Sequence, residues 1–286
     1  MILNASGCLD AATAPDVAPS LDAYVTKTVT PLPRGGNAPV RIAETETGML
    51  NSIGLANPGL DRVRAETLPA LSALGVPVWV SVGGFSARDY ARSSAALDRE
   101  DVVAAIELNL SCPNVAEPDA DPAAIVRASR AETAKPLYAK LSPAAPDIAA
   151  AALEALDAGA DGLSLVNTLR GLVLDRRTLR PALAAGAGGL SGPALRAVAL
   201  AAVYAVRRVT EAPIVAIGGI ETGRHALDAI AAGASAVALG TVLFSDPTAP
   251  ARIRSELERE AASHGFANPL DAKGCAHASE RLAVVR

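Results

Sequence analysis

The segment from Ile106 to Asn114 carries one thiol within a cluster of small polar residues, types that could do chemistry. Apolar residues alternate along it as far as Leu110, which predicts a buried strand. Pro113 cannot donate a hydrogen bond to a sheet, so the strand should end near Cys112. A thiol at that point could act as a base or nucleophile, whereas most free cysteines are inert core residues. The surroundings of Cys112 must therefore decide between these interpretations.

Two lysines stand where other strands should end, Lys27 within residues 25–28 and Lys140 within residues 138–142. An ammonium group inside apolar strand sequence is costly to bury without a counter-charge. Each lysine is therefore predicted to face a polar pocket or an anionic ligand. The alternative is a lysine that extends its charged end out to solvent.

Asparagines and glycines also occur near the ends of the predicted strands. Asparagine occurs in the run Asn51 to Leu55, at Asn109, at Asn114 and at Asn167. Amides offer donors and acceptors without charge, which suits an imide or uracil-like ring, although single asparagines are commonly turn or capping residues.

Glycine-rich turns predict a phosphate group on the ligand. They close the segments 214–219 and 237–241, and a third turn, 188–192, precedes a long helix. Backbone N–H groups of such turns converge on anions, and the loops after strands seven and eight are the usual phosphate site of a barrel. One glycine pair would indicate a plain turn, but three turns favour a phosphate-bearing ligand.

These residues must be positioned by alternating strands and helices. Strands are predicted near residues 2–6, 23–28, 77–82, 104–110, 136–141, 162–167, 213–218 and 236–240. Helices are predicted near residues 61–74, 86–98, 121–134, 147–158, 191–209, 222–232 and 249–263, with an irregular excursion over 29–60. This alternation predicts one α/β domain over residues 1–286, a (β/α)8 TIM barrel. A doubly wound open sheet is the alternative, although Ala5-Ser6-Gly7 is too short for its glycine fingerprint.

Composition narrows the partners to a small molecule. The 286 residues carry a formal net charge of −4 without a run of Lys or Arg, which argues against a nucleic-acid or anionic membrane surface. Cys8, Cys112 and Cys275 form no CxxC pair and the three histidines are scattered, so neither disulfides nor a metal site is expected. Cys8 is interpreted as structural. We expect a reduced cytoplasmic compartment, without a signal peptide or a membrane span.

Four runs together resemble dihydroorotate dehydrogenase of class 1. They are residues 51–55, 109–114, 188–193 and the pair Gly218-Gly219. Residues 41–45, 48–51, 57–59 and 167–169 further resemble the catalytic subunit of class 1B. Class 1B enzymes pair with a subunit carrying FAD and a [2Fe–2S] cluster and pass electrons to NAD⁺. Class 2 enzymes have serine at the position of Cys112 and an N-terminal membrane extension.

The resemblance implies an oxidoreductase of pyrimidine biosynthesis that converts (S)-dihydroorotate to orotate with FMN. Cys112 would be the base at C5 while a hydride leaves C6 for FMN, and Lys27 would lie near both the flavin and the substrate. The substrate would contact Lys27, Asn51, Ser52, Ile53, Gly54, Leu55, Asn109, Asn114, Asn167 and Thr168. FMN would contact Ser6, Lys27, Thr28, Ser81, Asn109, Lys140, Val166, Gly192, Gly218, Gly219, Gly240 and Thr241. A homodimer or a 2+2 heterotetramer is implied.

Three departures from the family pattern keep alternatives open. The family has an N-terminal hairpin that closes the bottom of the barrel. Either the bottom of this barrel is open, or the true N-terminus lies upstream of Met1. The loop 115–122 is shorter than usual, and Ser81 replaces a flavin-contacting asparagine. The alternatives are a flavin domain of the dihydropyrimidine dehydrogenase type, a phosphate-binding barrel isomerase or synthase without flavin, and a flavin-binding remnant with impaired turnover.

Overall fold

Eight parallel strands form the centre of the protein in a computed structural model that describes residues 1–10, 14–110 and 121–277. The strands are β1 (Ile2–Asn4), β2 (Tyr24–Val25), β5 (Val78–Val82), β6 (Val103–Asn109), β7 (Leu137–Leu141), β8 (Gly162–Leu165), β11 (Ile214–Ile217) and β12 (Ala236–Leu239). They follow the order β1-β12-β11-β8-β7-β6-β5-β2. Each lies within one of the eight predicted segments or begins one residue before it. The parallel order confirms that helices cross over between successive strands.

The two end strands of this sheet meet, which closes a (β/α)8 barrel and excludes the open doubly wound sheet. Leu3 bridges Ala23 in parallel. The buried side chain of Asn4 continues this seam: its Nδ2 donates to the Val25 carbonyl at 2.7 Å, and its Oδ1 accepts from the Val25 N–H at 2.8 Å. A side-chain amide therefore provides the hydrogen bonds that backbone pairing supplies between the other strands.

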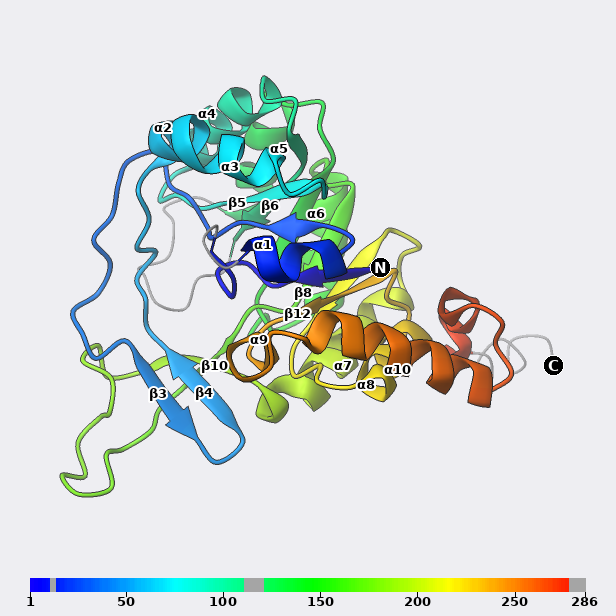
Figure 1. Cartoon of the computed structure of the whole chain (residues 1–286). Helices are drawn as coiled ribbons and strands as arrows, with labels where there is room; N and C mark the ends of the chain where they lie inside the picture. The colour runs from blue at the N-terminus through cyan, green and yellow to red at the C-terminus, as the bar shows by residue number, and fades with distance from the viewer. Residues whose placement is uncertain (11–13, 111–120, 278–286) are drawn as a thin grey trace.

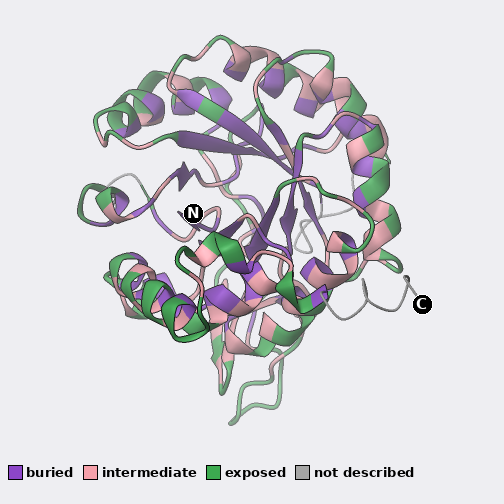
Figure 2. Ribbon diagram, turned by 90° about the vertical axis from the view of Figure 1, so that its right-hand side faces the viewer, coloured by how far each residue is buried: buried purple, intermediate pink, exposed green. Residues whose placement is uncertain are grey.

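Helices surround the strands and turn their exposed residues outwards (Figure 2). Leu60 to Ser72 is one helical stretch, composed of α2 (Leu60–Arg62), a π-helical turn (Val63–Thr67) and α3 (Leu68–Ser72). The others include α4 (Ala87–Asp98), α5 (Pro122–Arg130), α6 (Ile148–Asp157), α7 (Arg196–Arg207), α8 (Gly223–Ala231) and α10 (Ala249–Ser263), with the shorter α1 (Ala14–Val17) and α9 (Val242–Ser245). Side-chain caps start several of them; Ser86 accepts from the Asp89 N–H and Thr222 from the His225 N–H.

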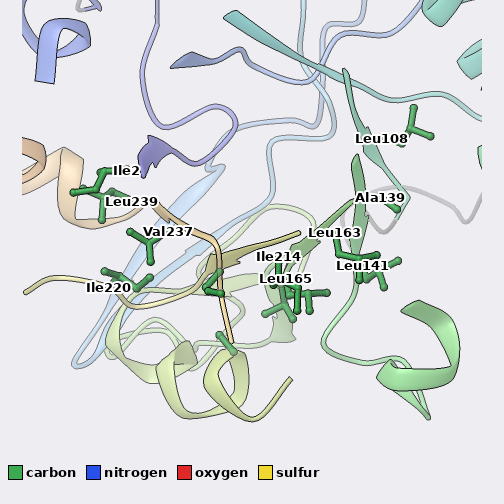
Figure 3. Close-up of a cluster of buried hydrophobic side chains, with 14 of the residues drawn as sticks. Ile2, Leu108, Ala139, Leu141, Leu163, Leu165, Ile214, Ile220, Val237 and Leu239 are labelled. Atoms are coloured by element: carbon green, nitrogen blue, oxygen red, sulfur yellow. The ribbon is translucent and has the colours of Figure 1, made fainter. Parts of the chain in front are cut away.

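The apolar core has two parts because alternate residues of a strand point to opposite faces. Residues such as Leu108, Ala139 and Leu165 pack between the strands and the helices, and Figure 3 shows several of them on neighbouring strands. A smaller cluster, which includes Val25, Trp79, Ala105, Val215 and Ala238, consists of strand residues of the opposite parity and fills the barrel interior.

A second sheet, absent from our sequence interpretation, corrects two predictions. It is antiparallel, with the order β3 (Ile42–Thr45), β4 (Gly48–Asn51), β10 (Gly188–Ser191) and β9 (Leu169–Gly171). The excursion 29–60 is therefore partly a hairpin, which stands away from the barrel in Figure 1. The predicted turn 188–192 is mostly strand β10, and the helix predicted over 191–209 begins only at Arg196, after a 3-10 turn over Pro193–Leu195.

Candidate active site

A cavity of about 250 Å³ opens where the parallel strands end, the position at which barrel enzymes place their active sites. The sequence-predicted residues that line it are Ser6, Lys27, Thr28, Asn51, Ile53, Gly54, Leu55, Asn109, Lys140, Val166, Asn167, Thr168, Gly192, Gly218, Gly219, Gly240 and Thr241. Ser52 and Ser81 do not line it. Cys112, Asn114 and most of the short loop 115–122 lie outside the described residues. Most of the residues that we predicted at strand ends therefore lie together around one cavity.

One side of the cavity carries a continuous chain of side-chain hydrogen bonds. Asn167 Nδ2 donates to Asn109 Oδ1 at 2.9 Å, and Asn109 Nδ2 donates to Thr28 Oγ1 at 3.1 Å. The Thr28 hydroxyl also lies 3.2 Å from Ser6 Oγ and 3.0 Å from Ser81 Oγ. Because each amide has a defined partner, the side chains are held in fixed orientations before any ligand binds.

Ser81 and Ser52 lie behind residues that line the cavity and hold their neighbours by hydrogen bonds. The Ser81 side chain is fully buried on β5 beside Thr28. Ser52 is 1% exposed, and its hydroxyl accepts a hydrogen bond from Asn37 Nδ2 at 2.7 Å. Asn37 also occupies the space beside Gly54, where an added Cβ would lie 2.4 Å from Asn37 Oδ1. The run 51–55 therefore depends on Ser52 for its shape and on its other members for the cavity surface.

The two predicted lysines both line the cavity, one from each of two strands. Lys27 follows β2, and Gly7 makes room for it, since an added Cβ there would lie 2.8 Å from Lys27 Cδ. Lys140 lies on β7 with its Nζ 3.5 Å from Glu107 Oε1. Lys140 thus has the counter-charge that its burial requires, and Glu107 is a residue that the sequence interpretation did not select.

A second side of the cavity is built from glycines, and close packing leaves no room for a side chain at Gly218 or Gly219. An added Cβ at Gly218 would lie 2.6 Å from Ala199 Cβ, and one at Gly219 would lie 2.8 Å from the Gly192 carbonyl oxygen. Gly219 also has φ +63°, a conformation that disfavours other residues. Thr241 Oγ1 donates to Ser191 Oγ at 2.9 Å beside this turn. Backbone N–H groups and hydroxyls in this arrangement suit a phosphate group.

Sequence reasoning missed several residues of the cavity wall. They are Ala5, Gly7, Cys8, Ile42, Met49, Ser191, Leu195, Ile217 and Phe244. Burial raises the pKa of the Cys8 thiol, although Lys140 and Lys27 oppose that effect, so Cys8 is neutral near pH 7. Cys8 follows the end of β1 as Lys27 follows β2, so its position after a strand could have indicated that it lies at the cavity. Ile42 and Met49 come from the hairpin that the sequence interpretation did not contain.

Within residues 1–10, 14–110 and 121–277, no group of three or more His, Cys, Asp or Glu side chains could hold a metal ion. Over the same ranges, no helix is long and apolar enough to cross a membrane.

Comparison with known proteins identifies the family. A protein-family model described as dihydroorotate dehydrogenase matches residues 1–260 of this chain. The chain belongs to the dihydroorotate dehydrogenase family. It is 44% identical over 289 residues to the dihydroorotate dehydrogenase B (NAD(+)), catalytic subunit, of Desulforudis audaxviator, covering 96% of this chain and 93% of that relative. The corresponding Listeria monocytogenes protein is 42% identical over 260 residues, covering 88% and 86%.

The fold comparison agrees with this assignment. A crystal structure of DHODH from Eimeria tenella in complex with ferulenol has a TM-score of 0.80 and 25% sequence identity, covering 96% of this chain and 85% of that one. The resemblance inferred from the motifs is thereby confirmed, including its likeness to the B-type catalytic subunit. Members of the dihydroorotate dehydrogenase family are oxidoreductases and are generally flavin-dependent. The cavity is therefore the candidate active site of a dihydroorotate dehydrogenase.

Proposed function

We propose that this protein oxidises (S)-dihydroorotate to orotate in pyrimidine biosynthesis, with FMN as its cofactor. The observation that carries the proposal is the cavity at the strand ends, where a fixed amide network, two lysines and a glycine-rich turn meet. Each of the three parts suits a different portion of the ligands: the pyrimidine ring, the negative charge and the phosphate. An isomerase or synthase without flavin would need the glycine-rich turn for a phosphate group, but it would not need the amide network.

The residues present fit FMN. Gly192, Gly218, Gly219, Gly240 and Thr241 would hold its phosphate, because side chains are excluded from the turn around Gly218 and Gly219 and backbone groups face the cavity. The flavin ring would contact Ser6, Lys27, Thr28, Asn109, Lys140 and Val166, with Ser81 supporting Thr28. When bound, FMN supplies the two-electron acceptor that no amino-acid side chain can provide.

The substrate would be oriented by the amide side of the cavity. Asn51, Asn109, Asn167 and Thr168 would bind the ring, and Ile53, Gly54 and Leu55 would form the adjacent wall. Lys27 would lie near the substrate carboxylate and balance its charge. Because Asn109 and Asn167 are already bonded to each other, little conformational freedom would be lost on binding.

Cys112 is proposed as the base that takes the proton from C5 while the hydride leaves C6. Two residues separate it from Asn109, which lines the cavity, and Asn114 follows as a further substrate contact in the proposal. The end of β6 is fixed in place, since the Tyr90 hydroxyl donates to the Asn109 carbonyl at 2.8 Å. A thiol can accept the proton if its pKa is lowered or if proton and hydride leave together.

We infer that a second subunit carrying FAD and a [2Fe–2S] cluster passes the electrons to NAD⁺. The relatives are named as catalytic subunits of an NAD(+)-linked enzyme, which supports such a partner. Either a homodimer or a 2+2 heterotetramer is compatible with this role. Co-expression of the chain with the electron-transfer subunit of a relative, followed by size-exclusion chromatography and NADH measurement, tests the pairing.

The decisive experiment is anaerobic addition of dihydroorotate to the purified protein while the flavin spectrum is recorded. The wild type should bleach, and Cys112→Ala should bleach at least about 100-fold more slowly, the usual contribution of a general base. Equal bleaching rates in both proteins would remove Cys112 from the mechanism. Bleaching by dihydrouracil but not dihydroorotate would assign a dihydropyrimidine dehydrogenase activity instead. Bound flavin that no substrate bleaches would indicate a flavin-binding remnant.

A further inference from the structure

Glu107 is a buried carboxylate directly beneath the cavity. It lies on β6 with the same parity as Ala105, which belongs to the cluster inside the barrel, and as Asn109, which lines the cavity. Its neighbours Ile106 and Leu108 have the opposite parity and pack against the helices. Glu107 itself is 2% exposed and does not line the cavity. Its carboxylate is therefore held in the barrel interior, two residues before Asn109 and one layer below the cavity lining.

Lys140 on the adjacent strand provides the opposite charge. The register pairs Asn109 with Lys140 and Glu107 with Tyr138, so the Lys140 side chain stands one step nearer the cavity than the carboxylate. Lys140 Nζ and Glu107 Oε1 are 3.5 Å apart, and the two side chains are 7% and 3% exposed. A charge in such a poorly solvated position persists only when it is paired, so the two groups require each other.

On the side away from the cavity, aromatic and hydroxyl side chains border this pair. The Trp79 and Tyr138 rings lie 4.4 Å apart in the barrel interior, and Ser81, which pairs with Glu107 in the sheet register, bonds to Thr28. Glu107 Oε1 lies 3.5 Å from Lys140 Nζ and offsets its positive charge, and low polarity strengthens this effect. The position of the carboxylate therefore controls both where the Lys140 ammonium points and how much of its charge reaches the cavity.

We propose that Glu107 is a positioning residue that holds Lys140 at the cavity wall and reduces the positive charge felt by the bound flavin. This inference rests on the proposed function. Positive charge near a flavin stabilises its anionic reduced form and its negatively charged sulfite adduct. By offsetting Lys140, Glu107 keeps the midpoint potential lower than Lys140 alone would set it, which suits onward transfer of the electrons to NAD⁺.

Glu107→Gln tests this inference, because the amide keeps the shape and removes the charge. The bound FMN of the variant should have a more positive midpoint potential and should bind sulfite about tenfold more tightly. Glu107→Asp should stay near the wild type in both measurements, since it retains the charge. Ser164→Ala is the matched control: Ser164 is fully buried, uncharged and paired with Lys140 in the sheet register. It should change neither measurement.

Loss of the Glu107 charge beside buried Lys140 could prevent Glu107→Gln from folding, so a second variant is included. Glu107→Gln/Lys140→Met removes both charges and should fold, with a midpoint potential closer to the wild type than that of Glu107→Gln. The inference is overturned if Glu107→Gln matches Ser164→Ala in midpoint potential and sulfite affinity. Where Glu107→Gln does not fold, the inference is overturned if the double variant does not fold either, because the charge of Lys140 is then not the cause of the failure. In that event, a wild type that still oxidises dihydroorotate leaves the proposed function intact. A wild type that binds no FMN refutes both.

Discussion

The two sides of the cavity are built by different means. The glycine side, around Gly192, Gly218 and Gly219, owes its shape to close packing of backbone against backbone. The amide side owes its chemistry to side chains, chiefly Asn109 and Asn167, whose hydrogen bonds fix their orientations. Any substitution on the first side adds atoms where there is no room, whereas substitution on the second removes atoms and leaves the backbone in place. The first should therefore fail by loss of shape and the second by loss of activity.

The largest effect is expected from Gly219→Ala on the glycine side. The new Cβ would lie 2.8 Å from the Gly192 carbonyl oxygen in a residue with φ +63°, which costs about 1–3 kcal/mol in strain alone. The turn should shift, so FMN affinity should fall by about 100-fold or more and the melting temperature should drop. Fluorescence titration of the apoprotein with FMN and thermal unfolding measure both.

Gly75→Ala is the matched control for this variant. Gly75 has a similar φ of +69°, but an added Cβ there would meet nothing within 4 Å. It should lose about 1 kcal/mol of stability and keep its affinity for FMN. If the two variants bound FMN equally well, close packing of the turn would not be what shapes the glycine side.

A smaller effect is expected from Asn109→Ala on the amide side. The change removes a donor to Thr28 and an acceptor for Asn167, and unsatisfied polar partners cost about 1–3 kcal/mol. A loss of that size in the transition state corresponds to a decrease of about fivefold to 150-fold in kcat/KM for dihydroorotate. Steady-state kinetics and thermal unfolding should show that activity falls far more than the melting temperature.

Asn268→Ala gives the matching control for a lost asparagine. Asn268 is exposed and caps a 3-10 turn over Pro269–Ala272, where its side chain accepts from the Leu270 N–H. Its replacement should leave kcat/KM unchanged. A variant Asn109→Ala that unfolded without any selective loss of activity would show that the network serves the fold and not the ligand.

The smallest effect concerns Cys8, which also lines the cavity. Burial raises the pKa of its thiol above 9.0, so the stability that depends on the neutral thiol is complete below pH 9 and is lost as pH rises through the folded-state value. Cys8→Ala should therefore weaken the decline in unfolding free energy at alkaline pH, measured by urea denaturation. In a Cys112→Ser background, exposed Cys275 should react with iodoacetamide at pH 8 well before Cys8. Faster reaction at Cys8 would contradict the raised pKa.

The barrel and the residues at the C-terminal ends of its strands could be predicted because both follow from local sequence. Buried parallel strands such as β6 and β11 are short apolar runs, and their C-terminal ends must meet. Lys27, Asn109 and Gly218 could therefore be placed together without knowing any contact between them. The same argument would have included Cys8, which follows β1, had the thiol not been treated as an ordinary core residue.

The small antiparallel sheet was not predicted because its two halves, the β3–β4 hairpin and β9–β10, are joined across a long stretch of chain. β4 pairs with β10 through Asn51 and Gly189, and exposed residues of β3 such as Ile42 give no clear pattern of burial. Gly188 resembled a turn residue, yet glycine is required there because an added Cβ would lie 2.7 Å from the Asn51 carbonyl oxygen. The Glu107–Lys140 pair was missed for a related reason, since its partners are identified only by the register of β6 and β7.

The seam that Asn4 closes has a consequence for the order of assembly. β1 is synthesised long before its partner β12, since Ile2 pairs with Val237. Such a distant partner makes closure a late event. Ser6 and Gly240, which follow these two strands, can take their places at the cavity only after that event. A nascent chain therefore has no complete binding site for its ligands until β12 and Gly240 have been synthesised.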